Sequence, residues 1–249
     1  EAIPAWTTSM AVVGLLLFAT SDSSFWFFEK GLNAADMATQ VSYKDILHCF
    51  ADPIIMLFIG GFILAIAATK SGLDVTLARI LLKPFGKQSR FVLLGFIMVT
   101  AVFSMFLSNT ATAAMMLTFL APVLATLPKD GGGRISLALA IPIAANIGGM
   151  GTPIGTPPNA IALGALEEAG YAVTFAGWML RMVPYVLIML FIAWILLQKL
   201  YPFKAKSIEL KIEGQEIKTT PFQKYVVWVT FALTIFLWVF EGLFKINSN

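Results

Sequence analysis

The fold is decided by two short polar breaks in apolar sequence, SNT at residues 108–110 and GGMGTPIGTPPN at residues 148–159. The first lies within the uncharged stretch from Phe91 to Leu127, and the second within the uncharged stretch from Ile135 to Leu166. Hydrocarbon cannot satisfy the backbone groups that such a break frees, so a polar break at membrane depth is tolerated only where protein or a water-filled cavity surrounds it. Two breaks in succession therefore predict a binding site inside a membrane protein.

The composition places the chain among integral membrane proteins. Hydrophobic residues make up 58% of it and charged residues 12%, whereas charged residues make up roughly 25% of an ordinary soluble domain. Several apolar stretches exceed the roughly 18 residues that distinguish a spanning helix from a buried core helix, and the alternation typical of a membrane β-barrel is absent. We therefore expect an all-α integral membrane protein in the lipid bilayer, with a bacterial inner or plasma membrane as its location.

The charged residues and the single cysteine exclude other classes of function. The net charge of +3 comes from basic residues in membrane-flanking loops, so no nucleic-acid partner is expected. One cysteine, Cys49, excludes an internal disulfide bond and any cysteine-based metal cluster. We expect no catalytic residues and no enzyme. The chain begins with EAIP, without an initiator Met or a basic signal-peptide region, so we expect it to begin part-way through a longer protein.

Four apolar stretches outside the breaks predict spanning helices. They run from Pro4 to Thr20, from Ile46 to Thr69, from Val173 to Leu200 and from Tyr225 to Phe244. In the second stretch, Gly60 and Gly61 are expected to permit close helix packing. Residues 201–224 alternate in charge and read as a linker between the last two spans.

Residues 70–90 differ from the spanning stretches, because apolar residues recur there at helical spacing and basic residues lie between them. The apolar positions are Leu73, Leu77, Ile80 and Leu81, and the basic ones include Arg79, Lys83 and Lys87. This pattern predicts an amphipathic helix that lies in the membrane interface and ends at Pro84 and Gly86. Residues 1–90 thus read as helices that precede the unit with the two breaks, which is expected at residues 91–168.

Both polar breaks interrupt helices. The arms Phe91 to Leu107 and Ala111 to Leu127 meet at residues 108–110 and predict a helical hairpin with its tip there, closed by a glycine-rich turn at residues 128–133. The stretches Ile135 to Ile147 and Asn159 to Leu166 are each too short to span, and together they match about one membrane thickness. They predict a single discontinuous helix, broken at residues 148–158.

The basic residues predict the orientation, since an excess of Lys and Arg marks cytoplasmic loops. Residues 70–90, 128–134 and 199–224 are basic and expected in the cytoplasm, while the acidic loops at residues 21–45 and 167–171 are expected outside. Every loop lies on the side of the membrane that its charge predicts only if the two arms of the hairpin begin and end on the same side. The hairpin is therefore predicted to be re-entrant.

The residue types at the breaks suit ion binding. Ser108, Asn109 and Thr110 are residues that cap helix N-termini, and Thr156 followed by Pro157 predicts a second cap with proline in the first turn. Two helix N-termini with free N–H groups and positive dipole ends would attract an anion. The helices that end at the tip and near residue 148 are expected to leave carbonyls unpaired.

Oxygen atoms near the tip suit a cation. Ser104 and Ser108 are four residues apart and share one helical face, and their hydroxyls, the Asn109 oxygen and the unpaired carbonyls are suitable ligands for Na⁺. No Lys, Arg, Asp or Glu occurs in the two uncharged stretches. Proton-coupled carriers usually use an intramembrane ionisable residue, so coupling to Na⁺ is the hypothesis that these residues favour.

Less specific interpretations remain open at this point. The SNT sequence alone is also typical of a helix kink or an interhelical hydrogen bond, and the GTPP sequence alone is typical of a loop. In that case the chain would be a non-transporting membrane subunit whose polar breaks only pack helices.

The same residues resemble the divalent anion:sodium symporter (DASS) family, which includes sodium-coupled di- and tricarboxylate transporters. The resemblance runs along essentially the whole chain and is carried by SNTATA at residues 108–113, IGTPPNA at residues 154–160, and Asp52-Pro53 with LFIGGF at residues 57–62. It implies a homodimeric elevator-type symporter of small carboxylates such as succinate or citrate, with residues 1–90 as scaffold-type helices and residues 91–168 as the transport-type unit. It also implies a Na⁺ site at Ser104, Ser108, Asn109 and Gly155, and a substrate carboxylate near Asn109, Thr110, Thr156 and Pro157.

The chain departs from the family pattern in one large respect. Family members have two inverted repeats, each with an SNT hairpin and a broken helix, and this chain contains only the first of each. We therefore expect half of an inverted-repeat transporter, lacking the C-terminal repeat; a natural half-length protein that pairs with a copy or a partner is the alternative. A carboxylate exchanger or an uncoupled carrier of the same fold is the alternative to symport.

Overall fold

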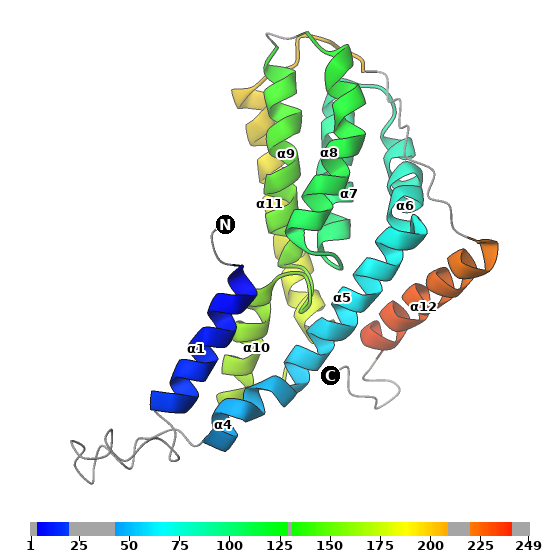
Figure 1. Cartoon of the computed structure of the whole chain (residues 1–249). Helices are drawn as coiled ribbons and strands as arrows, with labels where there is room; N and C mark the ends of the chain where they lie inside the picture. Colours follow the sequence, from blue (N-terminus) through cyan, green and yellow to red (C-terminus); the bar gives the residue numbers. More distant parts are fainter. Residues whose placement is uncertain (1–3, 20–42, 129–130, 209–219, 241–249) are drawn as a thin grey trace. The chain divides into compact units, whose positions relative to one another are not determined.

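The computed structural model describes residues 4–19, 43–128, 131–208 and 220–240, and these form helices joined by short connections (Figure 1). The chain divides into two compact units, Glu1–Met56 and Leu57–Asn249. Among the described residues, four helices are long and apolar enough to cross a membrane, within α5, α8, α11 and α12. The prediction of an all-α fold of the integral membrane type is confirmed at this level.

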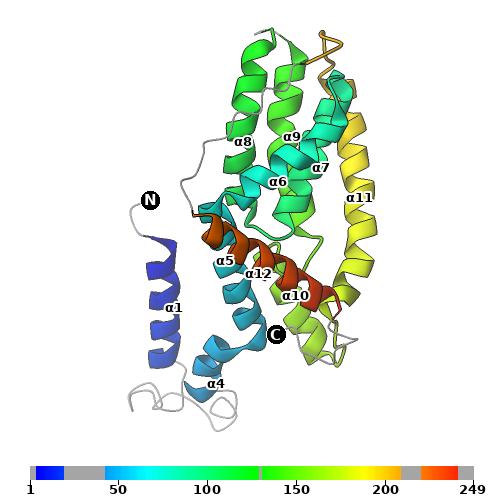
Figure 2. The same cartoon turned by 90° about the vertical axis from the view of Figure 1, so that its right-hand side faces the viewer.

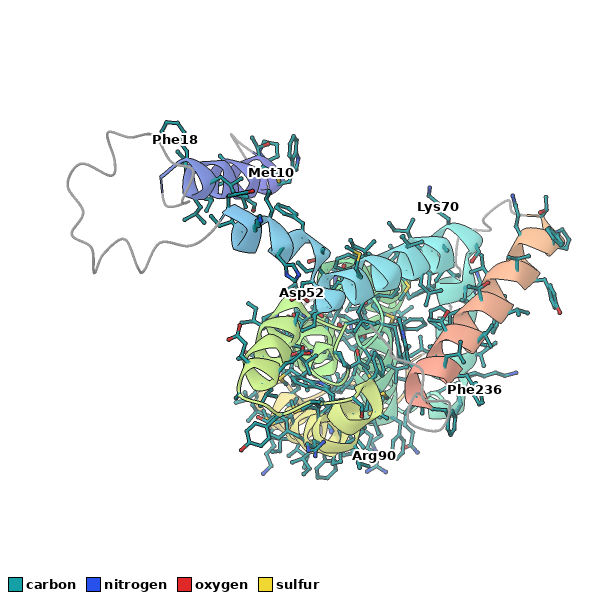
Figure 3. All side chains as sticks on the ribbon, turned by 90° about the horizontal axis from the view of Figure 1, so that it is seen from below. Met10, Phe18, Asp52, Lys70, Arg90 and Phe236 are labelled. Atoms are coloured by element: carbon teal, nitrogen blue, oxygen red, sulfur yellow. The ribbon has the colours of Figure 1, made fainter. Side chains whose placement is uncertain are left out.

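The first unit holds α1 (Ala5–Ala19), α4 (Tyr43–His48), the 3₁₀ turn η1 (Cys49–Ala51) and the start of α5 (Pro53–Ser71). The prediction of one uninterrupted helix from Ile46 is wrong, because the chain is extended at Asp52. Pro53 disfavours helical backbone at the residue before it. Asp52 then begins α5 by accepting a hydrogen bond from the Ile54 N–H at 2.7 Å (Figure 3).

The second unit continues α5 and adds the helices that carry the polar breaks. These are α6 (Leu73–Leu82), η2 (Lys83–Phe85), α7 (Ser89–Ser104), α8 (Asn109–Thr126), α9 (Gly132–Gly149), α10 (Pro157–Glu168), α11 (Phe175–Leu200) and α12 (Pro221–Val239). Side-chain caps explain several starts: Thr174 accepts from the Gly177 N–H, and Thr220 with Gln223 forms a capping box. This box begins α12 four residues before the predicted start, and the predicted end at Phe244 lies outside the described residues.

Helix α6 differs from the predicted interfacial helix in its length and in its buried face. Lys70 and Ser71 belong to α5, and α6 ends at Leu82. The buried positions of α6 are Leu73, Asp74, Ala78 and Leu82, whereas the predicted apolar positions Ile80 and Leu81 are exposed. The face is set by packing against α7, which selects the i, i+4 row from Asp74 to Leu82.

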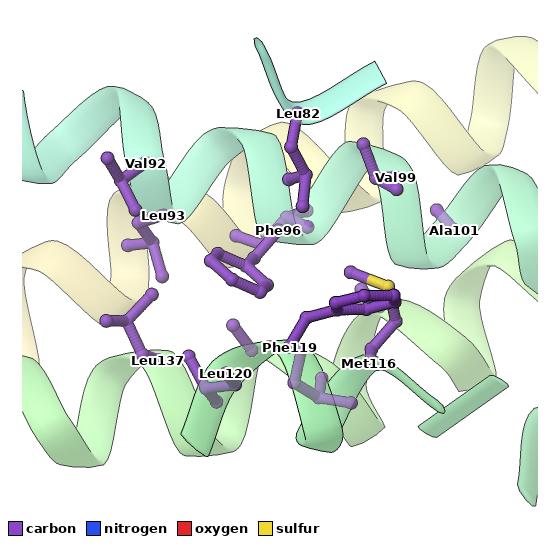
Figure 4. Packing of buried hydrophobic residues seen from close by; sticks show 14 of the residues in the cluster. Leu82, Val92, Leu93, Phe96, Val99, Ala101, Met116, Phe119, Leu120 and Leu137 are labelled. Atoms are coloured by element: carbon purple, nitrogen blue, oxygen red, sulfur yellow. The ribbon is translucent and has the colours of Figure 1, made fainter. Parts of the chain in front are cut away.

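Helices α7, α8, α9 and α11 run alongside one another in Figures 1 and 2 and enclose the main apolar core. Phe96 and Leu93 of α7 face Phe119 and Leu120 of α8 and Leu137 of α9, and all five side chains are at most 2% exposed (Figure 4). Helices α7 and α9 approach each other closely at Gly148. A Cβ atom built there would lie only 2.5 Å from the Ala101 Cα atom.

Two tryptophans of α11 donate hydrogen bonds to the start of α7 and to the end of α9. Trp194 Nε1 donates to the Arg90 carbonyl at the start of α7 at 2.9 Å, and Trp178 Nε1 donates to the Met150 carbonyl at 3.0 Å. Sixteen residues separate them, which is about 24 Å of helix, and α7 with its 16 residues has the same length. The start of α7 and the end of α9 are thereby held at two levels of α11 that are about one α7 length apart.

The discontinuous helix is longer than predicted. Helix α9 begins at Gly132, so Gly132 and Gly133 are helical and are not part of the turn that was predicted at residues 128–133. Both lie against the segment that follows α11: a Cβ at Gly132 would be 3.0 Å from the Pro202 carbonyl, and one at Gly133 would be 2.8 Å from Phe203 Cε1. With 18 residues, about 27 Å, α9 reaches the lower limit of a spanning helix. Helix α9 is nonetheless not among the described helices that are long and apolar enough to cross a membrane, so the prediction that each half is too short to span alone stays a prediction.

Three buried hydroxyls in these helices have no hydrogen-bond partner, those of Thr100, Thr112 and Ser136. We expect Thr100→Val and Thr112→Val each to raise the free energy of unfolding by about 1 kcal/mol, because an unpaired buried hydroxyl is replaced by a methyl group of similar shape. Thermal unfolding in detergent measures the change. Thr152→Val is the control and should lower stability, since the buried Thr152 hydroxyl donates to the Met105 carbonyl. A loss of stability in the first two variants would contradict the prediction.

Candidate functional site

The hairpin tip lies between the end of α7 at Ser104 and the start of α8 at Asn109. Ser108 is the N-cap of α8, and its Oγ accepts a hydrogen bond from the Ala111 N–H at 3.2 Å. The prediction of a capped helix start at the tip is therefore confirmed. The N–H groups of Asn109 and Thr110 precede the first intrahelical bond of α8, so they have no acceptor within the helix and can face an anion.

Three oxygen atoms meet just below the tip. Ser104 Oγ lies 2.7 Å from Asn109 Oδ1 and 2.7 Å from the Ala145 carbonyl oxygen. A hydroxyl carries one proton, so Ser104 can donate to only one of these two acceptors, and one pair of oxygens is left without a proton between them. We call Ser104 Oγ, Asn109 Oδ1 and Ala145 O the oxygen cluster. Its chemistry fits a cation with hard oxygen ligands.

Asn146 orients the amide of Asn109. Asn109 Nδ2 donates to Asn146 Oδ1 at 3.1 Å, and this bond leaves Asn109 Oδ1 pointing at Ser104. The assignment of oxygen and nitrogen in the Asn109 amide rests on this network of hydrogen bonds. Ser104 is fully buried, Asn109 is half-buried and Asn146 is exposed, so the cluster lies between the core and an open surface.

Three side chains hold the break between α9 and α10 closed. The Thr152 hydroxyl donates to the Met105 carbonyl at the end of α7. Asn159 of α10 donates to the Gly149 carbonyl at 2.8 Å and to the Thr152 carbonyl at 2.7 Å, and Trp178 of α11 donates to Met150. The prediction of unpaired carbonyls at these helix ends is therefore wrong for Met105, Gly149 and Met150, because side chains of the break and of neighbouring helices donate to them.

Close backbone contacts connect the break with the tip. A Cβ atom at Gly149 would lie 2.6 Å from Asn109 Oδ1, and one at Gly155 would lie 3.0 Å from the Gly149 Cα atom. The structure thus brings Ser104, Asn109 and Gly155, three of the four predicted Na⁺ residues, into one neighbourhood. The fourth, Ser108, is exposed and its Oγ faces the Ala111 N–H.

The start of α10 differs from the predicted anion site. Thr156 is the N-cap by position but its side chain makes no cap hydrogen bond. Pro157 and Pro158 have no N–H group, and the Asn159 N–H donates to the Thr156 carbonyl at 3.0 Å. The expected free N–H groups are therefore missing from the first turn of α10. Thr156, which is partly exposed, and the positive end of the helix dipole remain as the features that favour an anion there.

An open groove of about 390 Å³ adjoins the tip on the side of α8 and α9. Asn109 and Thr110 line it together with Asn146, and the rest of its lining is formed by Ala113, Ala114, Leu117, Pro142 and Ala145. The groove thus contains two predicted substrate residues, Asn109 and Thr110, and one residue that was not predicted, Asn146. The other two predicted substrate residues, Thr156 and Pro157, do not line this groove.

Four residues that hold the site together were not predicted from the sequence. They are Asn146, Thr152, Trp178 and, in its role of donating to two carbonyls of the break, Asn159. Asn146 was visible in principle, because it is an isolated amide in an uncharged apolar stretch. Asn159 was identified only as part of a helix start. Its actual partners, the carbonyls of Gly149 and Thr152, lie in a loop whose shape has no local sequence signature.

We expect Asn159→Asp to destabilise the break more than Asn159→Ala does. Alanine loses two hydrogen bonds in a buried site, at a cost of about 2 kcal/mol, whereas aspartate adds a carboxylate opposite two carbonyl oxygens. Thermal unfolding of the two variants measures the order. Equal stability of Asn159→Asp and the unaltered protein would contradict the hydrogen bonds described here.

The sequence matches the family model of the citrate transporters (CitMHS: Citrate transporter) over residues 1–248. Among curated relatives, the sodium-dependent dicarboxylate transporter SdcS of Staphylococcus saprophyticus is 35% identical over 215 residues, which cover 79% of this chain and 41% of the relative. The sodium-dependent high-affinity dicarboxylate transporter 3 of Caenorhabditis elegans is 35% identical over 211 residues, covering 75% of this chain and 37% of the relative.

A third relative, the SdcS protein of Staphylococcus aureus (strain USA300), is 33% identical over 213 residues, which cover 76% of this chain and 40% of that protein. The chain thus spans about two fifths of the length of the curated relatives that it matches. The matched region contains both polar breaks, since the family match extends from one end of the chain almost to the other. The chain belongs to the citrate transporter family, and its resemblance to the divalent anion:sodium symporters is confirmed.

Proposed function

We propose that this chain is part of a sodium-coupled symporter of small di- or tricarboxylates, of the size of succinate or citrate. The observation that carries the proposal is the oxygen cluster of Ser104, Asn109 and Ala145, which adjoins the start of α8 in a region without charged side chains. The names of the relatives, sodium-dependent dicarboxylate transporters, agree with it.

Sodium would be held by oxygen atoms at the tip and the break. Ser104 and Asn109 supply side-chain oxygens, and Gly155 keeps the backbone of the break close enough to take part because it has no Cβ. Ser108 contributes from its place at the tip. A bound Na⁺ supplies the positive charge that the site lacks in its own side chains, so the binding of an anion would depend on it.

The carboxylate would bind on the open side of the cation. Asn109 and Thr110 line the groove beside α8, and their N–H groups have no acceptor within the helix. Thr156 and Pro157 would approach the substrate at the positive end of α10, through the Thr156 hydroxyl and the helix dipole. Asn146, at the rim of the groove, would fix the amide of Asn109.

We further propose that the hairpin is re-entrant. Helix α7 is about 24 Å long and α8, with 18 residues, about 27 Å, both less than the roughly 30 Å of the hydrocarbon core, while the neighbouring α11 with 26 residues is about 39 Å long. A hairpin that starts beside the end of α11 would therefore stop short of the opposite surface. Residues 70–90, 128–134 and 199–224 would then be cytoplasmic, as their basic residues favour.

The complete transporter is proposed to contain a second, inverted repeat, to assemble as a homodimer and to work by an elevator movement. The lengths of the relatives support the first of these, because the chain covers only 41% or less of each of the three. Residues 1–90 would belong to the scaffold and residues 91–168 to the moving part. The second repeat would complete the substrate site.

Uptake of labelled succinate and citrate into proteoliposomes that contain the complete gene product tests the proposal. We expect uptake with an inward Na⁺ gradient and loss of it when choline replaces Na⁺. Uptake that is undiminished in choline would overturn sodium coupling. Transport that requires unlabelled carboxylate inside the vesicles would instead identify an exchanger of the same fold, and equilibration without either would identify an uncoupled carrier.

A further inference from the structure

A second groove, of about 530 Å³, lies at the other end of α7 from the hairpin tip. It is bounded by the start of α7, the end of α11 and the segment Tyr201–Ile208, which we call the strap. Its described lining residues are Gln88, Ser89, Arg90, Gln198, Pro202, Phe203, Ala205 and Lys206. Arg90 is labelled in Figure 3, and Figures 1 and 2 show the strap crossing the end of the unit where α8 ends and α9 begins.

The backbone around this groove is fixed by hydrogen bonds from distant parts of the chain. The strap pairs with the start of α7 in an isolated antiparallel bridge between Gln88 and Ser207. The Ser89 N–H donates to the Lys206 carbonyl at 3.2 Å, and the Ser89 hydroxyl donates to the Ala205 carbonyl. Trp194 of α11 holds the Arg90 carbonyl. These hydrogen bonds therefore fix the backbone at Arg90 and at Lys206, which lie on opposite sides of the groove.

The polar side chains of the groove match an anion. Arg90 and Lys206 supply two positive charges, Gln88 and Gln198 supply amide donors, and none of the described lining residues is acidic. The positive end of the α7 dipole and the negative end of the α11 dipole both lie at this groove, so the basic side chains rather than the helix dipoles supply its positive charge. The Arg90 guanidinium carbon lies 4.8 Å from the centre of the Phe91 ring, which restrains the arginine beside the groove.

We propose that this groove binds a phosphate group with uncompensated negative charge, carried by an anionic phospholipid at the membrane surface. Basic pockets between membrane helices near the surface are suited to such headgroups. Helix α11 is a candidate span that ends beside the groove at Leu200, and the exposed Phe191 and partly exposed Trp194, seven and four residues before Gln198 on the same face, offer a path for acyl chains. A free phosphate ion would satisfy the same donors but would leave these apolar residues uncovered.

This site is distinct from the proposed transport site. Fourteen residues of α7 separate Arg90 from Ser104, which is about 21 Å. The two sites share no residue, and binding of a lipid here does not depend on whether the protein carries carboxylates or requires Na⁺. The lipid would clamp the strap to the start of α7 and thereby stabilise the base of the hairpin.

Thermal unfolding of the purified complete gene product in detergent tests the proposal, with three probes: dioleoylphosphatidylglycerol, dioleoylphosphatidylcholine and inorganic phosphate. We expect phosphatidylglycerol to raise the unfolding temperature and phosphatidylcholine to have much less effect. The variant R90Q/K206Q should bind phosphatidylglycerol about thirtyfold more weakly, since each basic residue near an anionic lipid contributes about fivefold. The control K83Q/K199Q removes the same charge at residues outside the groove and should keep the shift.

The measured shifts decide whether the groove binds a phosphate group and whether that group comes from a lipid or from solution. Equal shifts with the two lipids, or an unchanged shift in R90Q/K206Q, would overturn the proposal. A shift with inorganic phosphate as large as that with phosphatidylglycerol would support the site and assign it to a soluble ligand. If R90Q/K206Q does not fold, native mass spectrometry of the unaltered protein decides: retention of phosphatidylglycerol over phosphatidylcholine from an equal mixture supports the site, and equal retention overturns it.

Discussion

Replacement of Gly148 by alanine is expected to prevent the protein from reaching its folded state. The added Cβ atom would lie 2.5 Å from the Ala101 Cα atom, and its neighbours there are backbone atoms of α7 that no side-chain rotation can move. Overpacking of a tight core commonly costs 1–3 kcal/mol, and we expect more than about 3 kcal/mol here because two helix backbones must separate. Yield of monodisperse protein and thermal unfolding measure the loss.

Gly60→Ala is the matched control for Gly148→Ala. Gly60 also lies within an apolar helix, but a Cβ atom at that position meets nothing within 4 Å. Alanine is the better helix former, so the variant should be as stable as the unaltered protein or more so. If both glycine variants fold equally well, the close approach of α7 and α9 is wrong.

The second large effect is expected for Ser104→Ala. The substitution removes one member of the oxygen cluster and leaves Asn109 Oδ1 and the Ala145 carbonyl without their common partner. Changes in the shell around a bound metal typically weaken its binding by about 10–100-fold, and loss of a ligand should do at least as much. We expect the Na⁺ concentration for half-maximal uptake to rise at least about tenfold, as measured in proteoliposomes.

Thr100→Val controls for a general disturbance of α7. Thr100 lies about one turn from Ser104 and is also fully buried, but its hydroxyl has no partner. The valine variant should keep the Na⁺ dependence of the unaltered protein. An equal rise in the required Na⁺ in both variants would show that Ser104 acts through packing. An unchanged Na⁺ dependence in Ser104→Ala would remove its hydroxyl from the proposed site.

Features set by local chemistry could be predicted from the sequence. The cap at Ser108 follows from the hydroxyl of one residue and an N–H three residues later. The break after Gly149 follows from Gly and Pro residues in a row. The uncharged stretches likewise predicted the membrane class. All three features depend on residues that are neighbours in the sequence.

Features set by contacts between distant residues could not be predicted. The carbonyls at the ends of α7 and α9 were expected to be free, but Thr152 of the break, Asn159 of α10 and Trp178 of α11 reach them. Packing against α7 determines which face of α6 is buried, whereas the apolar pattern of α6 itself predicted a different face. At the start of α10, the two prolines indicated the helix start correctly and also removed the N–H groups that an anion would use.

The strap has a consequence for how the protein is made. The Ser89 hydroxyl pairs with a carbonyl 116 residues later in the chain. Ribosomes add about 5–20 residues per second, so the base of the hairpin waits about 6–23 s for this partner after it has been synthesised. The partners of Ala101 and Asn109 in α9 also follow the hairpin in the sequence. During this interval the nascent hairpin must be sheltered by lipid or by the insertion machinery, because α9 and α11 are synthesised only in the course of it.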